Sequence, residues 1–152
     1  MSERRISARG IIFKDGKILA QRPKADGVAY DFWCTMGGGM EIGESVQDCL
    51  RREMVEETGI MPEIGRLLYI QQFYDRKGRE IIDFFFEITN VDDYEHIDLA
   101  KTTHGELETA EFGFVVPDSV NLKPKFLRTR DIANDLISQT AVAVIDNLQE
   151  VE

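Results

Sequence analysis

The sequence predicts an α/β fold in which a β-sheet is covered on both faces by helices. Segments of strand-like polarity recur along the chain, and two helical segments lie well apart among them. A length of 152 residues fits one domain that spans residues 1–152. With 43% hydrophobic and 30% charged residues, the composition is that of a globular protein rather than a disordered one.

The chain begins with a predicted β-hairpin. Its strands cover residues 6–13 and 17–21, and they flank Asp15-Gly16. This pair readily adopts the positive φ angles that a two-residue turn needs. A short strand is expected over residues 32–35 after a loop.

A helix over residues 45–58 has the clearest signals at both ends. Ser45 can cap its start with Asp48 three residues on, and Gly59 can end it in the left-handed conformation. The glycines at 37–39 precede this helix, and they predict a flexible crossing where the backbone is open to close approach.

Two long strands are predicted over residues 64–74 and 80–89, with a turn at Lys77-Gly78 between them. The second strand alternates cleanly, and its apolar residues share one face that we assign to the core. These residues are Ile82, Phe84, Phe86 and Ile88.

The C-terminal part is predicted to contain a polar acidic loop over 90–111, a strand over 112–116 and a helical segment that Pro124 can start. Apolar residues keep helical spacing through this last segment, which fits one helix or two. They are Ala133, Leu136, Ile137, Ala141, Val144 and Leu148.

Charge and composition exclude several functions. A net charge of −10 repels a nucleic-acid backbone, so duplex DNA or RNA is not expected as a partner. The longest apolar run has five residues, over 141–145, whereas a membrane span needs about 18 or more. The N-terminus lacks the apolar stretch of a secretory signal, so a cytoplasmic location is expected. Cys34 and Cys49 lack the spacing of a zinc site, and we interpret both as buried thiols.

Acidic residues continue the apolar stripe of the predicted helix. Glu53 and Glu57 fall within about 20° of Val46 on a helical wheel, and Glu56 lies close by. Desolvated carboxylates without a partner would cost several kcal/mol each, as an order of magnitude, so a cation must meet them. Mg²⁺ with oxygen ligands is the natural candidate, because a glycine-rich backbone that can approach an anion precedes the helix. The alternative is a solvated acidic face with Glu–Arg pairs.

The same region resembles a known signature. The residues read Gly38, five residues, Glu44, seven residues, then Arg52-Glu53-Met54-Val55-Glu56-Glu57-Thr58-Gly59-Ile60. This pattern, over residues 38–60, matches every defined position of the Nudix box and is typical of the Nudix hydrolase superfamily. The resemblance implies an α/β/α sandwich with a mixed β-sheet between helices, in which the box forms a loop, a helix and a second loop.

The resemblance also implies roles for individual residues. The carboxylates expected to bind Mg²⁺ or Mn²⁺ are Glu53, Glu56 and Glu57. Arg52 matches a position that orients the catalytic glutamates through a salt bridge, whereas Glu44 more often supports the loop. Substrate contacts are expected from Gly37, Gly38, Gly39 and Arg22, although a strand-end charge is an equal reading of Arg22. Thr35-Met36 stands where many members carry Leu-Pro, which loosens the loop without removing a ligand.

The implied reaction is hydrolysis of a nucleoside diphosphate linked to another group, by attack of water on phosphorus. Glu56 or Glu57 is a candidate general base, as is a glutamate from a later loop. The loop candidates are Glu106, Glu108 and Glu111, and we choose Glu108. Five aromatic residues are candidates to stack a nucleobase, although strand aromatics more often belong to the core. They are Tyr30, Phe32, Trp33, Phe73 and Tyr74. His104 is a candidate ligand contact, although a lone loop histidine is more often exposed.

The substrate is not specified by the box. The lack of an added recognition domain favours a nucleoside triphosphate, including an oxidised one. ADP-ribose and dinucleoside polyphosphates are the alternatives, and position 74 is Tyr where many ADP-ribose pyrophosphatases carry a proline. A sensor that binds a nucleotide without hydrolysis is a further alternative, but such modules usually lose a box carboxylate and none is missing here. A homodimer is left open.

Overall fold

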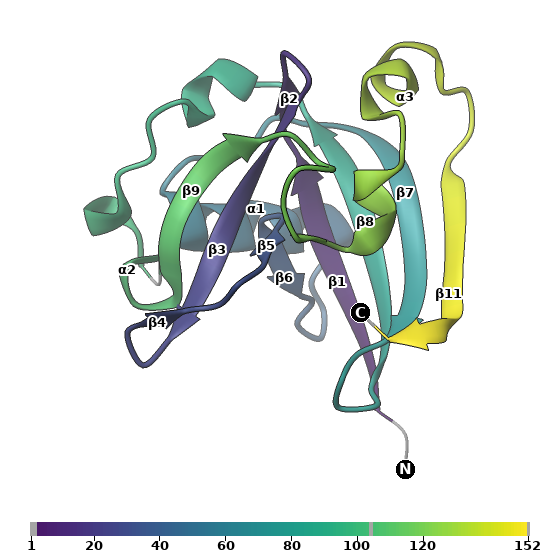
Figure 1. Cartoon of the computed structure of the whole chain (residues 1–152), viewed down its shortest axis with the longest axis horizontal. Coiled ribbons are helices and arrows are strands. Elements are labelled where there is room, and N and C mark those ends of the chain that lie inside the picture. The colour runs from purple at the N-terminus through teal and green to yellow at the C-terminus, as the bar shows by residue number, and fades with distance from the viewer. Residues whose placement is uncertain (1–2, 104, 152) are drawn as a thin grey trace.

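The computed structural model describes residues 3–103 and 105–151, and it contains two sheets with a helix against one of them (Figure 1). The first sheet has five strands in the order β11-β7-β8-β1-β6. In chain order these strands are β1 (Arg4–Ile11), β6 (Gly37–Gly39), β7 (Ile64–Tyr74), β8 (Glu80–Ile88) and β11 (Ala143–Val151). The sheet is mixed, because β1 runs parallel to β8 and antiparallel to β6.

The second sheet is built around β3 (Lys17–Ala25), which pairs with β9 (Thr109–Val115) along most of its length. Its remaining strands have two residues each: β2 (Phe13–Lys14), β4 (Val28–Ala29), β5 (Trp33–Cys34) and β10 (Leu122–Lys123). The predicted hairpin is confirmed for β2 and β3, where Asp15 and Gly16 both have positive φ angles, of 52° and 77°. The predicted first strand is divided at Ile12, so its two parts join different sheets.

Three α-helices and three 3-10 turns complete the described chain. The α-helices are α1 (Val46–Thr58), α2 (Gly105–Glu108) and α3 (Ile132–Ser138). The 3-10 turns are η1 (Val91–Tyr94), η2 (Leu99–Lys101) and η3 (Lys125–Arg128). None of these helices is long and apolar enough to cross a membrane.

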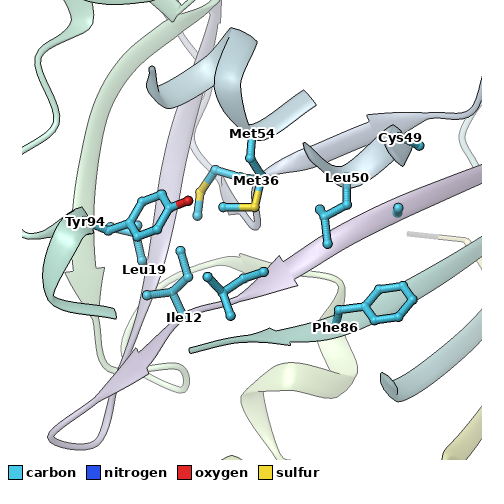
Figure 2. Close-up of a cluster of buried hydrophobic side chains, with 10 residues drawn as sticks. Ile12, Leu19, Met36, Cys49, Leu50, Met54, Phe86 and Tyr94 are labelled. Atoms are coloured by element: carbon cyan, nitrogen blue, oxygen red, sulfur yellow. The ribbon is translucent and has the colours of Figure 1, made fainter. Parts of the chain in front are cut away.

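Two hydrophobic clusters lie on opposite sides of the first sheet. One cluster joins the inner face of α1 to β1, β3 and β8, and Figure 2 shows Leu50 and Met54 of the helix reaching the strand residues. The other joins β1, β7 and β8 to η3 and α3, through Leu127 and Ile132. The α/β class with a mixed sheet is therefore confirmed, with α1 on one face and the shorter C-terminal helix on the other.

The predicted C-terminal helix is wrong beyond Ser138. Only α3 is helical, and residues 143–151 form β11, which pairs in parallel with β7 at the edge of the sheet. The apolar residues fit either period over a short span, but Ile137 is 86% exposed and Val144 is 71% exposed. Pairing with β7 satisfies the backbone of Ala143, Val144 and Ile145, and this tertiary pairing overrides the helical spacing.

Three smaller expectations are also corrected. The glycines at 37–39 are not a flexible crossing but strand β6, which pairs with β1. The acidic loop is shorter than predicted, because η1, η2 and α2 lie within it and Glu111 belongs to β9. Cys49 is buried as expected, whereas Cys34 is only partly buried.

The packing of α1 gives a first prediction. Leu50→Ala should lower the free energy of unfolding by about 2–5 kcal/mol, because the side chain is fully buried between α1 and the sheet. Arg51→Ala, on the exposed face of the same turn, should change it by no more than about 0.5 kcal/mol. Urea denaturation measures both values. Equal losses for the two variants would contradict the assigned inner face of α1.

Candidate active site

The helix α1 carries the predicted carboxylates, and local interactions fix both of its ends. The side chain of Ser45 accepts a hydrogen bond from the Asp48 N–H, and Gly59 ends the helix with a φ of 75°. The buried face of α1 contains Cys49, Leu50, Met54 and Thr58. The helix prediction for residues 45–58 is confirmed, and the box glutamates lie beside strand β6.

Glu57 is held against the glycine strand. The Gly37 N–H donates to its Oε2 at 3.0 Å. Burial raises the pKa of Glu57 to about 8, although the positive charge of Arg9 and the Gly37 N–H both lower it. Ionised Glu57 is therefore costly at neutral pH unless a further cation lies nearby.

Arg52 gathers the other carboxylates at this end of the helix. Its guanidinium contacts both carboxylate oxygens of Glu44, through Nε at 2.7 Å and Nη2 at 3.0 Å. Its Nη1 also donates to Glu53 at 2.9 Å and to Glu56 at 3.5 Å. Hydrogen bonds from Arg52 lower the pKa of Glu44 to about 2. The structure thus brings Arg52 to the glutamates as the salt-bridge prediction requires.

Strand β6 needs glycine because two other elements approach it closely. A Cβ at Gly38 would lie 2.4–2.6 Å from the carboxylate of Glu53, and one at Gly39 would lie 2.6 Å from Nε of Arg5. Gly37 has a φ of 135°, and a Cβ there would lie 2.0 Å from the carbonyl oxygen of Ala8. Gly38 thus lets Glu53 of α1 approach β6, while Gly37 and Gly39 let residues of β1 approach it.

The carboxylate oxygens of the box glutamates are the kind of ligand that a hard divalent cation prefers. Glu53, Glu56 and Glu57 offer carboxylate oxygens on one side of α1, which Mg²⁺ prefers to nitrogen or sulfur. Among the residues that the structure describes, no three His, Cys, Asp or Glu side chains are gathered closely enough to hold a metal ion. Arg52 draws Glu53 and Glu56 to itself, while Glu57 lies against Gly37.

The glycines predicted to contact substrate lie beside the box glutamates in β6, whereas Arg22 and the loop glutamates have other surroundings. Arg22 donates to Glu111 at 3.0 Å across β3 and β9, and to the Tyr30 carbonyl oxygen at 3.2 Å. Glu111 is thus an ion-pair partner, whereas Glu106 and Glu108 are exposed on α2. The loop that carries α2 contacts the end of α1, because the Thr103 N–H donates to the Glu56 carbonyl oxygen at 3.2 Å. His104 lies outside the described residues.

The aromatic candidates have separate positions. Tyr30 and Phe32 contact each other with ring centroids 5.4 Å apart, and Trp33 packs against the second hydrophobic cluster. Tyr74 is exposed at the end of β7, and Phe73 lines a small cavity.

This cavity lies beside Arg9 of β1 and Phe73 of β7. It has a volume of about 140 Å³, and it is lined by Arg9, Cys34, Thr35, Phe73, Asp83, Lys123 and Pro124. Arg9 Nη1 donates to the Thr35 and Gly37 carbonyl oxygens at 3.2 and 3.3 Å. Arg9 therefore connects the cavity to the same strand that holds Glu57.

Sequence reasoning missed three residues of the site. Arg9 lies within the predicted first strand of the hairpin. A charged residue in that strand was the only feature of the sequence that could have pointed to a role for Arg9. Gln21 and Thr109 are buried and hydrogen bonded to each other at 2.7 Å. Neither carries a sequence signal, because their proximity to Glu57 depends on how β3 pairs with β9.

Comparison with known proteins identifies the family. The sequence pattern of the NUDIX domain matches residues 3–136. The chain belongs to the Nudix family. Solved structures share its fold: the E. coli ORF135 protein has a TM-score of 0.69 at 22% identity and covers 92% of this chain and 96% of its own. A MutT protein from Methanosarcina mazei Go1 has a TM-score of 0.66 at 21% identity, over 83% of this chain and 89% of its own.

Curated relatives are more similar in sequence over shorter spans. An ADP-ribose pyrophosphatase from Methanocaldococcus jannaschii is 38% identical over 49% of this chain and 43% of its own. A mouse diphosphoinositol polyphosphate phosphohydrolase 2 is 38% identical over 43% of this chain and 36% of its own. The chain thus spans less than half the length of these two relatives.

The raised pKa of Glu57 gives a second prediction. The folded chain keeps this proton up to about pH 8, whereas the unfolded chain loses it near the ordinary value of 4.5. The folded state then binds more protons between these values, so the wild type loses stability as pH rises through this range. Without divalent cations, Glu57→Gln should become more stable than the wild type by about 1 kcal/mol or more at pH 8, and by much less at pH 4.5. Urea denaturation across this range measures the difference, and a constant difference would contradict the assignment.

Proposed function

We propose that this Nudix protein is a metal-dependent pyrophosphohydrolase that cleaves a nucleoside diphosphate linked to another group. The observation that carries this proposal is the complete set of box carboxylates, Glu53, Glu56 and Glu57, placed beside a strand of three glycines. Nudix modules that only bind nucleotides usually lack one of these carboxylates. Hydrolysis therefore explains the intact set better than sensing does.

Nudix proteins typically depend on a divalent metal. We propose Mg²⁺ or Mn²⁺, held by Glu53, Glu56 and Glu57. Bound cations neutralise the charge of a pyrophosphate and lower the pKa of a coordinated water. They also favour the ionised form of Glu57, whose pKa burial raises to about 8.

Arg52 has two tasks in this proposal. Its contacts with Glu44 and with the Gly39 carbonyl oxygen, the latter at 3.1 Å, fix the box loop against α1. Its contacts with Glu53 and Glu56 neutralise them when no cation is bound. Cation binding then requires these two carboxylates to exchange one positive partner for another, while Glu44 keeps Arg52 in place.

The cavity beside Arg9 is the candidate site for the nucleobase. Its volume of about 140 Å³ is below the roughly 300–1,000 Å³ of most small-molecule pockets, so it suits one ring rather than a whole nucleotide. Phe73 and Pro124 provide apolar walls, and Lys123 and Asp83 provide a donor and an acceptor. Arg9 and Lys123 place two positive charges beside the one negative charge of Asp83, so the charge of the walls does not select against phosphates. The small volume is the feature that favours a single nucleobase ring over a larger, phosphate-covered ring.

Several nucleotides meet this description. A nucleoside triphosphate, including an oxidised one, is our first choice. ADP-ribose is the alternative supported by the name of the Methanocaldococcus relative, and dinucleoside polyphosphates are a further one. Phosphate release in Mg²⁺ across deoxynucleoside triphosphates, 8-oxo-dGTP, ADP-ribose, diadenosine polyphosphates and nucleotide sugars tests these choices together.

Loss of a box carboxylate should abolish the reaction. Glu57→Gln should reduce kcat/KM on the best substrate at least 100-fold, because the amide cannot supply the negative charge that the cation needs. Glu63→Gln, which removes an exposed carboxylate that contacts Thr89 and not the box residues, should leave it within about twofold. Excess EDTA should stop the wild type. Turnover that persists in EDTA or in Glu57→Gln would refute the metal assignment.

The choice of Glu108 as general base is tested against its neighbour on α2. Glu108→Gln should lower kcat by about 100-fold or more with little change in KM, as loss of a general base does. Glu106→Gln is the matched control, because both glutamates are exposed on the same short helix. Steady-state kinetics at saturating Mg²⁺ separate the two. If Glu108→Gln keeps wild-type kcat, Glu108 is not the base, and the remaining candidates are the box carboxylates and the other two loop glutamates.

A further inference from the structure

The glycine strand β6 is the place where side chains of α1 and of β1 meet. It lies at one end of the strand order, with β1 as its partner. At Gly37 the N–H donates to Glu57 at 3.0 Å, and the carbonyl oxygen accepts from Arg9 at 3.3 Å. At Gly39 the carbonyl oxygen accepts from Arg52 at 3.1 Å. Side chains of the site thus bond these backbone groups of β6.

Arg5 of β1 lies against the same strand. A Cβ at Gly39 would be 2.6 Å from Nε of Arg5 and 2.8 Å from its Nη2, so the guanidinium lies directly over this glycine. Side chains alternate along a strand, and Arg5 therefore shares a face of β1 with Arg9, which lines the proposed nucleobase cavity. At the neighbouring Gly38, a Cβ would meet the carboxylate of Glu53 instead. Arg5 is thus placed one residue along β6 from a proposed metal ligand.

Arg5 differs from the other arginines near the start of β1 in having no carboxylate partner. Arg4 pairs with Glu80 at 2.9 Å, and Arg79 pairs with Asp75 at 2.7 Å. Within residues 3–103 and 105–151, no side chain forms an ion pair or a hydrogen bond with Arg5. In a chain with a net charge of −10, this guanidinium is a positive group that remains available to an anion beside the box.

Arg5 also lines a groove between the start of β1 and the loop that precedes α1. The groove has a volume of about 590 Å³, which is within the roughly 300–1,000 Å³ of small-molecule sites. Glu44, which holds Arg52, lines it as well, so the groove adjoins the box. Glu3 and Glu41 are exposed along the same groove, and an anion is therefore expected at Arg5 itself rather than throughout the groove.

We propose that Arg5 binds the group linked to the nucleoside diphosphate, and that this group is a phosphate. The substrate is then a nucleoside triphosphate rather than ADP-ribose or a nucleotide sugar. The proposal rests on the proposed function, since it names the group that the diphosphate carries. A guanidinium presents two parallel N–H groups that match two oxygens of a phosphate, whereas an uncharged sugar at the same place offers it no charge.

Steady-state kinetics in saturating Mg²⁺ on a matched pair of substrates tests this assignment. The pair is the nucleoside triphosphate that the wild type hydrolyses best, and ADP-ribose or the nucleotide sugar with the same base. Arg5→Gln should lower kcat/KM for the triphosphate about 10–100-fold, mainly through KM, because a charge-assisted contact with the substrate is lost. The same variant should change kcat/KM for the sugar compound by no more than about twofold.

Two further variants separate this contact from a general effect of charge. Arg5→Lys keeps the charge without the two-point contact, and it should retain more activity on the triphosphate than Arg5→Gln. Arg51→Gln removes the same charge from the exposed face of α1 and should leave both substrates within about twofold of the wild type. Because both arginines are exposed, all three variants should melt with the wild type in EDTA.

Calorimetric titration with inorganic tripolyphosphate in Mg²⁺ provides a measurement that does not depend on turnover. Arg5→Gln should weaken this binding about 10–100-fold, and Arg51→Gln should not. Equal binding by the two variants would overturn the role of Arg5, as would equal losses of activity on the triphosphate and the sugar compound. A wild type that hydrolyses ADP-ribose or nucleotide sugars but no triphosphate also rejects this proposal and leaves the proposed function standing. If the wild type hydrolyses no compound of the panel, the proposed function fails, and tripolyphosphate binding alone decides whether Arg5 holds a phosphate.

Discussion

The hydrogen bond from the Gly37 N–H to Glu57 is the contact on which the rest of the site depends. It requires α1 to lie against β6 so closely that Gly38 has no room for a side chain beside Glu53. The capping of α1 by Ser45 and its buried face hold the helix at that place. Burial there raises the pKa of Glu57 to about 8, so folding alone leaves this carboxylate in an unfavourable environment. A bound cation would remove that disadvantage, which links the buried carboxylate to the proposed activity.

Charge explains how an acidic chain can act on an anion. The net charge of −10 opposes a phosphate ligand at long range, and the site has only a few positive groups. Arg52 is committed to Glu44, Glu53 and Glu56. Cations that replace part of this pairing would reverse the local field beside the glycine strand. In the proposed function, anion binding would thus be conditional on metal, and Arg52 pairs with Glu53 and Glu56 when no metal is bound.

Sequence reasoning succeeded where the determining interactions are local. The helix α1 and strands β7 and β8 follow from capping residues, turn glycines and alternation within each segment, and the box motif located Glu53, Glu56, Glu57 and Arg52 together. Sequence reasoning failed where the structure depends on pairing between segments that are distant in the sequence. Strand β11 depends on the free edge of β7, and its short apolar run fits either period. Arg9, Gln21 and Thr109 reach the site only through the sheet register, which no spacing along the chain reveals.

The difference between the box residues and the residues positioned by strand pairing bears on substrate choice. In the proposed function, residues within the box act on the pyrophosphate, which every candidate substrate shares, so they would not discriminate among these substrates. The residues that line the small cavity come from β1, β5, β7, β8 and the chain around Pro124. Charges of both signs on its walls, from Arg9, Lys123 and Asp83, suit a ring with both donors and acceptors, and its small volume suits a single ring. Specificity in this chain is therefore expected to depend on the sheet that supports the box rather than on the box itself, and half-chain identity to a relative is a weak guide to it.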